Sequence, residues 1–131
     1  MNKGTYILFI KLKEELNFKT SKKKFHLKPG YYVYVGSAMK NLFQRVGRHI
    51  SYKEGTYKKH WHIDNILEVG NVERVFLIPD GEYREIQVSK MFSKEFMSIK
   101  GFGASDIKEL EANLYFINDT EKAYDLLKFI K

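Results

Sequence analysis

A chain of 131 residues, with 44% hydrophobic and 15% aromatic residues, is long enough for one globular domain with one core and too short for two. It contains no cysteine, which excludes disulfides, thiolate catalysis and zinc sites built on Cys. No apolar run approaches the ~20 residues that a membrane span requires, and lysines interrupt the N-terminal apolar stretch too early for a signal peptide. We therefore expect a cytoplasmic protein without membrane contact.

The net charge of +7 is distributed unevenly along the chain. Residues 1–60 hold 14 Lys and Arg against 3 acids, a balance of +11, whereas residues 61–131 hold 9 against 13, a balance of −4. Such asymmetry within one domain suggests a basic face for a polyanion such as nucleic acid. A solvated Lys-rich surface is the alternative, and charge alone favours neither.

The first third of the chain predicts two strands. TYILFIKL (5–12) is apolar on both faces, as in a buried strand. YYVYVG (31–36) is rich in aromatic and β-branched residues and follows the turn signal KPG (28–30), which predicts the second strand. Segment 17–27 carries the Lys22–Lys24 run, and we expect a loop or a short edge strand there.

After Gly36 the apolar residues recur at helical spacing and predict an amphipathic helix. Its apolar face would consist of Met39, Leu42, Phe43, Val46 and Ile50. Arg45 and His49 are four residues apart and would point the same way. Spacing alone favours an exposed polar face for them, opposite Leu42 and Val46; a polar basic loop (51–59) follows.

The rest of the chain predicts a small sheet covered by helices. We expect a loop and short helix ending at Gly70 (60–70), a strand (72–78) closed by the turn Pro79-Asp80-Gly81, and a helix (82–97) with Ile86, Met91, Phe92 and Phe96 apolar. A Gly-rich loop (101–106), a final strand (110–117) and a helix (118–131) follow. Asn118 or Asp119 would cap that last helix, and Ala123, Leu126, Leu127 and Ile130 would line one of its faces.

Several polar residues carry more than one interpretation. Alternation puts Tyr32 and Tyr34 on one face of their strand. Tyr34 lies just before the turn from strand to helix, where side chains face a shared cleft; the alternative is core packing, which explains most strand tyrosines. His60, His62 and Asp64 occupy alternate positions and could form a metal site along an extended segment; structural His–Asp pairing is favoured, and we expect no zinc. GFGASD lacks the Lys-Ser/Thr of a phosphate-binding P-loop.

Taken together, these motifs resemble the GIY-YIG nuclease superfamily. Gly4-Thr5-Tyr6 is similar to its first motif and Tyr34-Val35-Gly36 to its second. Arg45, eleven residues after Tyr34, matches the Arg of the following helix, and His49 matches a His frequent in the same helix.

The match is nearer still to a branch of this superfamily found alone or fused to endonuclease-III-type glycosylases. The shared segments are GYYVYVGSA (30–38), RVGRH (45–49), HWHIDNIL (60–67), REI (84–86) and GFGASD (101–106). The cysteines of the branch are missing, and Asn113 is the counterpart of the Asn common in the superfamily. The resemblance implies an α+β fold: a small, central, mainly antiparallel sheet flanked by helices, in one domain spanning residues 1–131.

The resemblance also implies a metal-dependent endonuclease that hydrolyses DNA phosphodiesters in repair or processing. Glu85 would hold one Mg²⁺ or Mn²⁺, Arg45 would neutralise a phosphate oxygen, and Tyr6 or Tyr34 would take a proton from the attacking water with help from Arg45, His49 and the metal. Nucleic-acid contacts are expected from Lys40, Arg48, Lys53, Lys58, Lys59, His60 and His62. Gly4, Gly36, Ser37, Trp61, Asp64 and Asn113 would complete the cleft.

Two other functions remain open at this point. One is a nucleic-acid-binding module of the same fold that cleaves weakly or not at all and needs neither Glu85 nor a metal. The other is a metal enzyme centred on His60, His62 and Asp64. As partners we expect nucleic acid, with DNA favoured over RNA, and a repair protein.

Overall fold

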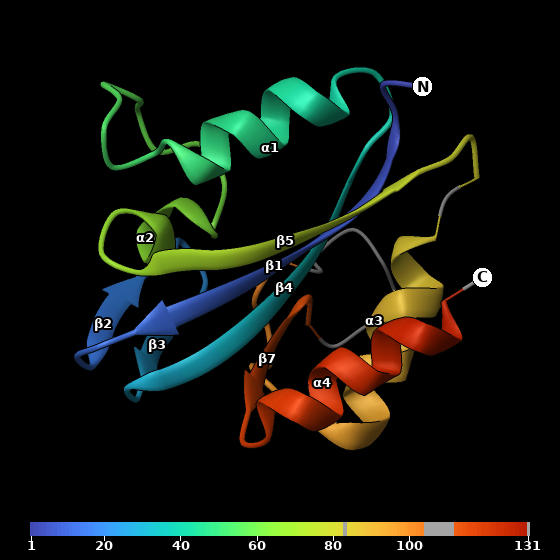
Figure 1. The fold of residues 1–131 in the computed structure, drawn as a ribbon. Coiled ribbons are helices and arrows are strands. Elements are labelled where there is room, and N and C mark those ends of the chain that lie inside the picture. Colours follow the sequence, from blue (N-terminus) through green and yellow to red (C-terminus); the bar gives the residue numbers. More distant parts are fainter. Residues whose placement is uncertain (83, 104–111, 131) are drawn as a thin grey trace.

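A five-stranded antiparallel sheet forms the centre of the protein (Figure 1). The structure is a computed structural model that describes residues 1–82, 84–103 and 112–130. The strand order is β5-β1-β4-β7-β6. The strands are β1 (Gly4–Leu12), β4 (Gly30–Ala38), β5 (Asn71–Pro79), β6 (Met97–Ser98) and β7 (Leu114–Ile117). The expected α+β fold with a mainly antiparallel sheet is confirmed.

The two strands predicted in the first third of the chain, β1 and β4, lie side by side in the middle of the sheet. Their antiparallel register places Tyr6 opposite Gly36 and Leu8 opposite Tyr34. The other edge of β1 pairs with β5, so β1 is hydrogen-bonded on both sides. Both faces of β1 are also covered, with Leu8 in one core and Ile7 in the other, which explains why its sequence is apolar on both faces. The pairing also brings the Gly4-Thr5-Tyr6 and Tyr34-Val35-Gly36 motifs together.

Each face of the sheet packs on its own core. One core contains Tyr32 and Tyr34 and is covered by α1 (Leu42–Ile50), α2 (Asp64–Leu67) and a hairpin of β2 (Leu16–Lys19) and β3 (Lys24–Leu27). The other contains Val33 and Val35 and is covered by α3 (Glu85–Glu95), α4 (Thr120–Leu126) and the 3₁₀ turn Leu127–Phe129. The expected alternation of faces along β4 is confirmed.

The face of α1 that packs on the core differs from the face predicted from its apolar residues. Leu42, Val46 and His49 are buried in α1, whereas Phe43 and Ile50 are exposed. Met39, the remaining residue of the predicted face, is also exposed. The expectation of an exposed polar face for His49 is therefore wrong. A buried histidine needs a hydrogen-bond partner, and Tyr6 of β1 provides one for His49.

Segment 17–27 is mostly a hairpin and not a loop. Phe18 and Phe25 are cross-strand partners that turn inward, while the side chains between them face solvent. The short strand β6 was not expected either; two residues are too few to leave a period in the sequence. The expected strand 72–78 corresponds to β5, which is longer by one residue at each end.

The predicted helix 82–97 is the shorter α3, and its buried residues are Glu85, Val88, Ser89 and Phe92. Of the apolar residues expected to line it, Ile86 and Met91 are only half-buried, and Phe96 is buried but follows the end of the helix. Asp119 caps α4, because its Oδ1 accepts a hydrogen bond from the Lys122 backbone N–H. Residues 104–106 of the Gly-rich loop and 110–111 of the expected final strand lie outside the described residues. None of the described helices is long and apolar enough to cross a membrane.

Candidate active site

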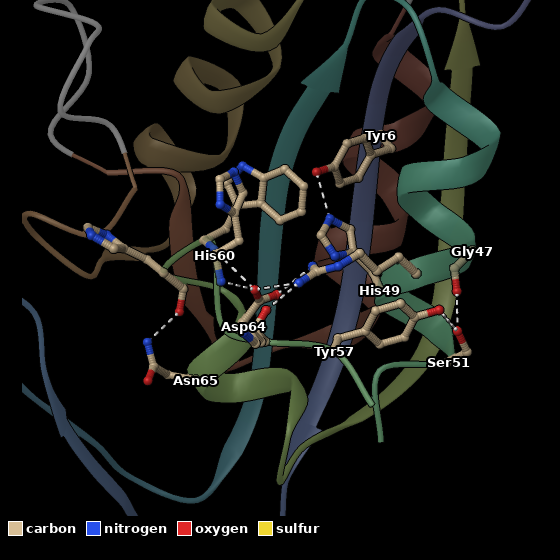
Figure 2. A network of polar contacts seen from close by, with 12 residues as sticks. Tyr6, Gly47, His49, Ser51, Tyr57, His60, Asp64 and Asn65 are labelled. Atoms are coloured by element: carbon tan, nitrogen blue, oxygen red, sulfur yellow. Dashed lines mark hydrogen bonds and ion pairs between the residues drawn. The ribbon is translucent and has the colours of Figure 1, made fainter. Parts of the chain in front are cut away.

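Tyr6 lies directly over Gly36, and no other residue type fits opposite it. A Cβ built on Gly36 would stand 2.5 Å from both Cζ and the hydroxyl oxygen of Tyr6. The Tyr6 hydroxyl lies 2.9 Å from Nε2 of His49 on α1 (Figure 2). Tyr34 completes the aromatic group, with its ring centroid 6.3 Å from that of Tyr6. The two tyrosine motifs and the helix histidine thus form one cluster.

Burial keeps this cluster uncharged. It raises the pKa of Tyr6 well above the usual value, although the nearby positive charge of Arg45 offsets part of the effect. It raises the pKa of Tyr34 as well. It lowers the pKa of His49 to about 4; the negative charge of Asp64 acts in the opposite direction, and the positive charges of Arg48 and Arg45 lower this pKa further. His49 is therefore neutral at pH 7 and can accept a proton from Tyr6 at Nε2.

Glu85 approaches the cluster from α3, which packs on the other face of the sheet. It is the first residue of α3, and its two carboxylate oxygens accept hydrogen bonds from Ser37 Oγ at 2.8 Å and Asn113 Nδ2 at 3.0 Å. Arg45 Nη1 donates to the backbone oxygen of the same Ser37 at 2.7 Å. Ser37 therefore bridges an acid and a guanidinium that are 40 positions apart in the sequence.

Several buried polar atoms of this site have no hydrogen-bond partner among the described residues. In the described part of the chain, five buried side-chain polar atoms have no hydrogen-bond partner, and three of them are Arg45 Nε, His49 Nδ1 and Asn113 Oδ1. Such atoms are rare in folded proteins, because an unpaired buried polar group costs ~1–3 kcal/mol. The three residues that carry them contact Ser37, Tyr6 or Glu85, so the unpaired atoms lie within this cluster of polar residues.

The HWHID segment is organised by an ion pair. Arg48 donates two hydrogen bonds of 3.0 Å to the two carboxylate oxygens of Asp64, which is fully buried. Asp64 Oδ2 also accepts from the backbone N–H groups of His60 and Trp61 (Figure 2). Burial alone would raise the pKa of Asp64, but these hydrogen bonds outweigh it and lower that pKa.

This arrangement corrects two expectations. Asp64 pairs with Arg48 and not with a histidine, because a buried carboxylate is best satisfied by the forked guanidinium. Residues 60–64 form a turn at the start of α2 and not an extended segment, so His60, His62 and Asp64 do not line one side. Among the described residues there is no group of three or more His, Cys, Asp or Glu that could hold a metal ion.

Trp61 is held between the two helix arginines. The guanidinium carbon of Arg45 lies 4.8 Å from the Trp61 ring centroid and that of Arg48 lies 4.7 Å from it. The ring also meets His49 edge-on, at a centroid distance of 5.8 Å. Cation–π contacts of this kind fix the orientation of Arg45 without using its N–H groups.

A hydrogen-bond chain connects this turn to Glu85. Nδ1 of His62 accepts from the Gly103 backbone N–H at 3.2 Å, and the Gly103 oxygen accepts from Asn113 Nδ2 at 3.4 Å. Asn113 in turn donates to Glu85. The sequence placed Gly103 in the shared segment GFGASD but gave no sign of these contacts, since they are made by its backbone groups.

The remaining predicted site residues differ in whether their side chains have partners in the protein. Gly4 adopts a φ of 150°, and a Cβ there would meet the Ile78 oxygen, which explains the glycine. Lys53 Nζ donates to Asn71 Oδ1 and Lys59 pairs with Glu68, whereas Lys40 and Lys58 are exposed. Sequence reasoning also missed Tyr52 and Tyr57, whose rings contact Arg48; Tyr52 could have been found from its spacing of four.

Comparison with known proteins gives a family but no activity. A search of curated proteins and a search of solved structures each found no match to this chain. One family model matches residues 5–130, and it therefore includes β1 to α4 and every candidate site residue except Gly4. The chain belongs to the family described as Domain of unknown function DUF123.

Proposed function

We propose that this protein is a metal-dependent endonuclease that hydrolyses phosphodiester bonds in DNA, with a site of the GIY-YIG type. One observation carries the proposal: Arg45 and Glu85 are bridged through Ser37, next to the buried Tyr6–His49 pair. Phosphodiester hydrolysis needs a cation for the phosphate, an acid for a metal and a proton acceptor. All three residue types meet here, although they come from β1, β4, α1 and α3.

The acidic side of the site fits a single Mg²⁺ or Mn²⁺. Glu85 supplies a carboxylate, and Asn113 Oδ1 is a buried amide oxygen without a partner in the described part of the chain. Mg²⁺ prefers oxygen ligands and keeps several waters, so one carboxylate and one amide oxygen suit it better than the imidazoles of HWHID. When bound, such an ion supplies charge stabilisation for the scissile phosphate and the leaving oxygen.

The basic side of the site would bind the phosphate. Arg45 donates one Nη1 N–H to the Ser37 oxygen, and its guanidinium lies against the Trp61 ring. The other guanidinium N–H groups would donate to a non-bridging phosphate oxygen. Arg48 was expected to contact nucleic acid, but its guanidinium is committed to Asp64 and to the Lys58 oxygen. We assign Arg48 to positioning the HWHID turn.

Tyr6 would pass the proton of the attacking water to His49. A tyrosine whose pKa is raised does not ionise in advance at pH 7, but it can give its own proton to a neighbour while it accepts one. Neutral His49, 2.9 Å away, is that neighbour. Of the two tyrosines, Tyr6 has this acceptor, so we favour Tyr6 over Tyr34 for the proton transfer.

A DNA-binding module without cleavage is the second candidate. The burial of Tyr6 and Tyr34 favours this candidate, because it raises the pKa values of both side chains and so disfavours a tyrosinate as the base. Removal of the proton from water would then depend on His49 alone. This candidate keeps Arg45 and the surrounding lysines as phosphate contacts and assigns Glu85 to structure alone.

The Glu85→Gln variant separates the two candidates. Nicking of supercoiled plasmid and cleavage of branched DNA are measured with Mg²⁺ and with Mn²⁺, next to DNA binding and thermal unfolding. On the nuclease proposal, cleavage collapses while binding persists and the fold survives. Glu121→Gln is the matched control, because Glu121 is also an acid in the first turn of a helix, α4, but is exposed.

Equal cleavage by wild type and Glu85→Gln would show that the site assignment is wrong. A wild-type protein that binds DNA but cleaves none of these substrates with either ion would leave the binding module as the function.

A further inference from the structure

The β2–β3 hairpin carries a group of lysines that the site described above does not use. Lys19 and Lys24 are direct cross-strand partners and both are exposed. Lys22 is exposed in the turn between the strands, which is closed by a hydrogen bond from the Thr20 N–H to the Lys23 oxygen at 2.8 Å. Within the described part of the chain, none of these three lysines forms an ion pair with an acid.

This arrangement works against the stability of the hairpin. Like charges directly opposite each other on an antiparallel pair are destabilising, and a two-stranded ribbon is marginal by itself. The turn between Lys19 and Lys24 adds two more lysines, Lys22 and Lys23, to the same end. A polyanion bound to this end would neutralise the repulsion, and DNA is the polyanion that the proposed function assigns to the neighbouring site.

The hairpin is anchored to the wall of the candidate active site. Phe18 stacks on Phe25 at a centroid distance of 5.1 Å, and both meet Phe102 edge-on, at 6.1 and 5.6 Å. Phe102 in turn meets Tyr34 at 6.2 Å and His62 at 5.7 Å. A single ring therefore separates the hairpin core from two candidate site residues, on the face of the sheet that also carries α1 and α2 (Figure 1).

We propose that the β2–β3 hairpin is a second DNA-contacting element, in which Lys19, Lys22 and Lys24 bind phosphates that flank the one held by Arg45. The proposal rests on the proposed function, since it takes the DNA from there. A shallow hollow of about 430 Å³ is lined by residues of both hairpin strands, Lys19 and Lys24 among them. Exposed lysines without acid partners are the groups that neutralise the phosphates of a DNA duplex.

The test compares two triple variants with the same change in net charge. One replaces Lys19, Lys22 and Lys24 by Gln. The control replaces Lys90, Lys94 and Lys128 by Gln; these lysines are exposed on α3 and on the 3₁₀ turn, which cover the other face of the sheet. Binding to a labelled DNA duplex of about 30 base pairs is measured by fluorescence anisotropy, without divalent ions, between ~50 and ~200 mM salt.

The hairpin variant should bind more weakly, with a plot of log K against log salt concentration that is shallower by about 2.7, since each lost phosphate contact removes ~0.9. The control should keep the wild-type slope. The melting temperature of the hairpin variant should equal or exceed that of wild type, because the Lys19–Lys24 repulsion is gone.

The outcomes separate this proposal from the one on which it rests. If wild type binds with a steep salt dependence and the hairpin variant keeps the same slope, the hairpin proposal is overturned and the proposed function stands. If both triple variants lose slope equally, the effect is one of net charge and the hairpin proposal is again overturned. If wild type does not bind DNA at low salt, both proposals fall.

Discussion

Replacing Gly36 by Ala should damage the candidate active site while leaving the backbone of β4 unstrained. The added Cβ would stand 2.5 Å from the Tyr6 ring and hydroxyl, whereas non-bonded carbon atoms pack at about 3.5–4.0 Å. Tyr6 must therefore move by about 1 Å, which is enough to break or distort its 2.9 Å contact with His49. Misplacing a reacting group by ~1 Å can reduce the rate ~10²-fold.

We therefore expect plasmid nicking with Mg²⁺ or Mn²⁺ to fall by about two orders of magnitude, with DNA binding retained. Overpacking of this kind costs ~1–3 kcal/mol of stability, so thermal unfolding is measured alongside. Gly47→Ala is the matched control, since nothing lies within 4 Å of a Cβ there and Gly47 is exposed in α1. It should stabilise the fold by ~0.5–1 kcal/mol and leave nicking unchanged. A folded Gly36→Ala variant that nicks at the wild-type rate would refute the role of Tyr6.

Asp64→Asn should destabilise the protein by ~3–5 kcal/mol in urea unfolding, because it leaves the Arg48 guanidinium without its buried acid. Glu68→Gln removes the exposed Lys59–Glu68 pair and should cost less than ~1 kcal/mol; equal costs would contradict the assignment of Arg48–Asp64 as the anchor of the turn. The pKa of His49 is about 4 in the folded protein, below the usual 6.5, so the unfolded chain binds the proton of His49 more tightly. The free energy of unfolding should therefore fall by up to ~3 kcal/mol as the pH drops from ~6.5 to ~4. His49→Gln should flatten this dependence of stability on pH. The pKa of Asp64 is lowered from 3.8, so Asp64 contributes only at lower pH. An unchanged slope in His49→Gln would therefore argue against a buried neutral His49.

The sequence was most informative where one physical constraint dominated. A strand hydrogen-bonded on both edges and covered on both faces must be apolar throughout, and β1 was recognised for that reason. The alternating faces of β4 were equally predictable, because the two-residue period leaves no choice once one face is fixed.

Prediction was less successful where a polar residue replaced an apolar one in the core. In α1 the buried stripe runs through His49, which any hydrophobicity pattern assigns to solvent, while Phe43 and Ile50 are exposed. The reason lies 43 positions away in Tyr6, whose hydroxyl satisfies the imidazole. Single-sequence periodicity contains no such long-range partner. The pairing of Asp64 with Arg48, and not with a neighbouring histidine, was missed for the same reason.

The position of β1 in the middle of the sheet has a consequence for folding during synthesis. β1 leaves the ribosome before every other strand described, yet its second edge pairs with β5, which ends at Pro79. At ~5–20 residues per second, the ribosome needs roughly 3 to 13 s to reach the end of β5 from the end of β1. During that interval the strand that bears Tyr6 presents an apolar, unpaired edge to other nascent chains. The yield of folded protein should therefore depend on translation speed through residues 13–79 and on chaperone supply.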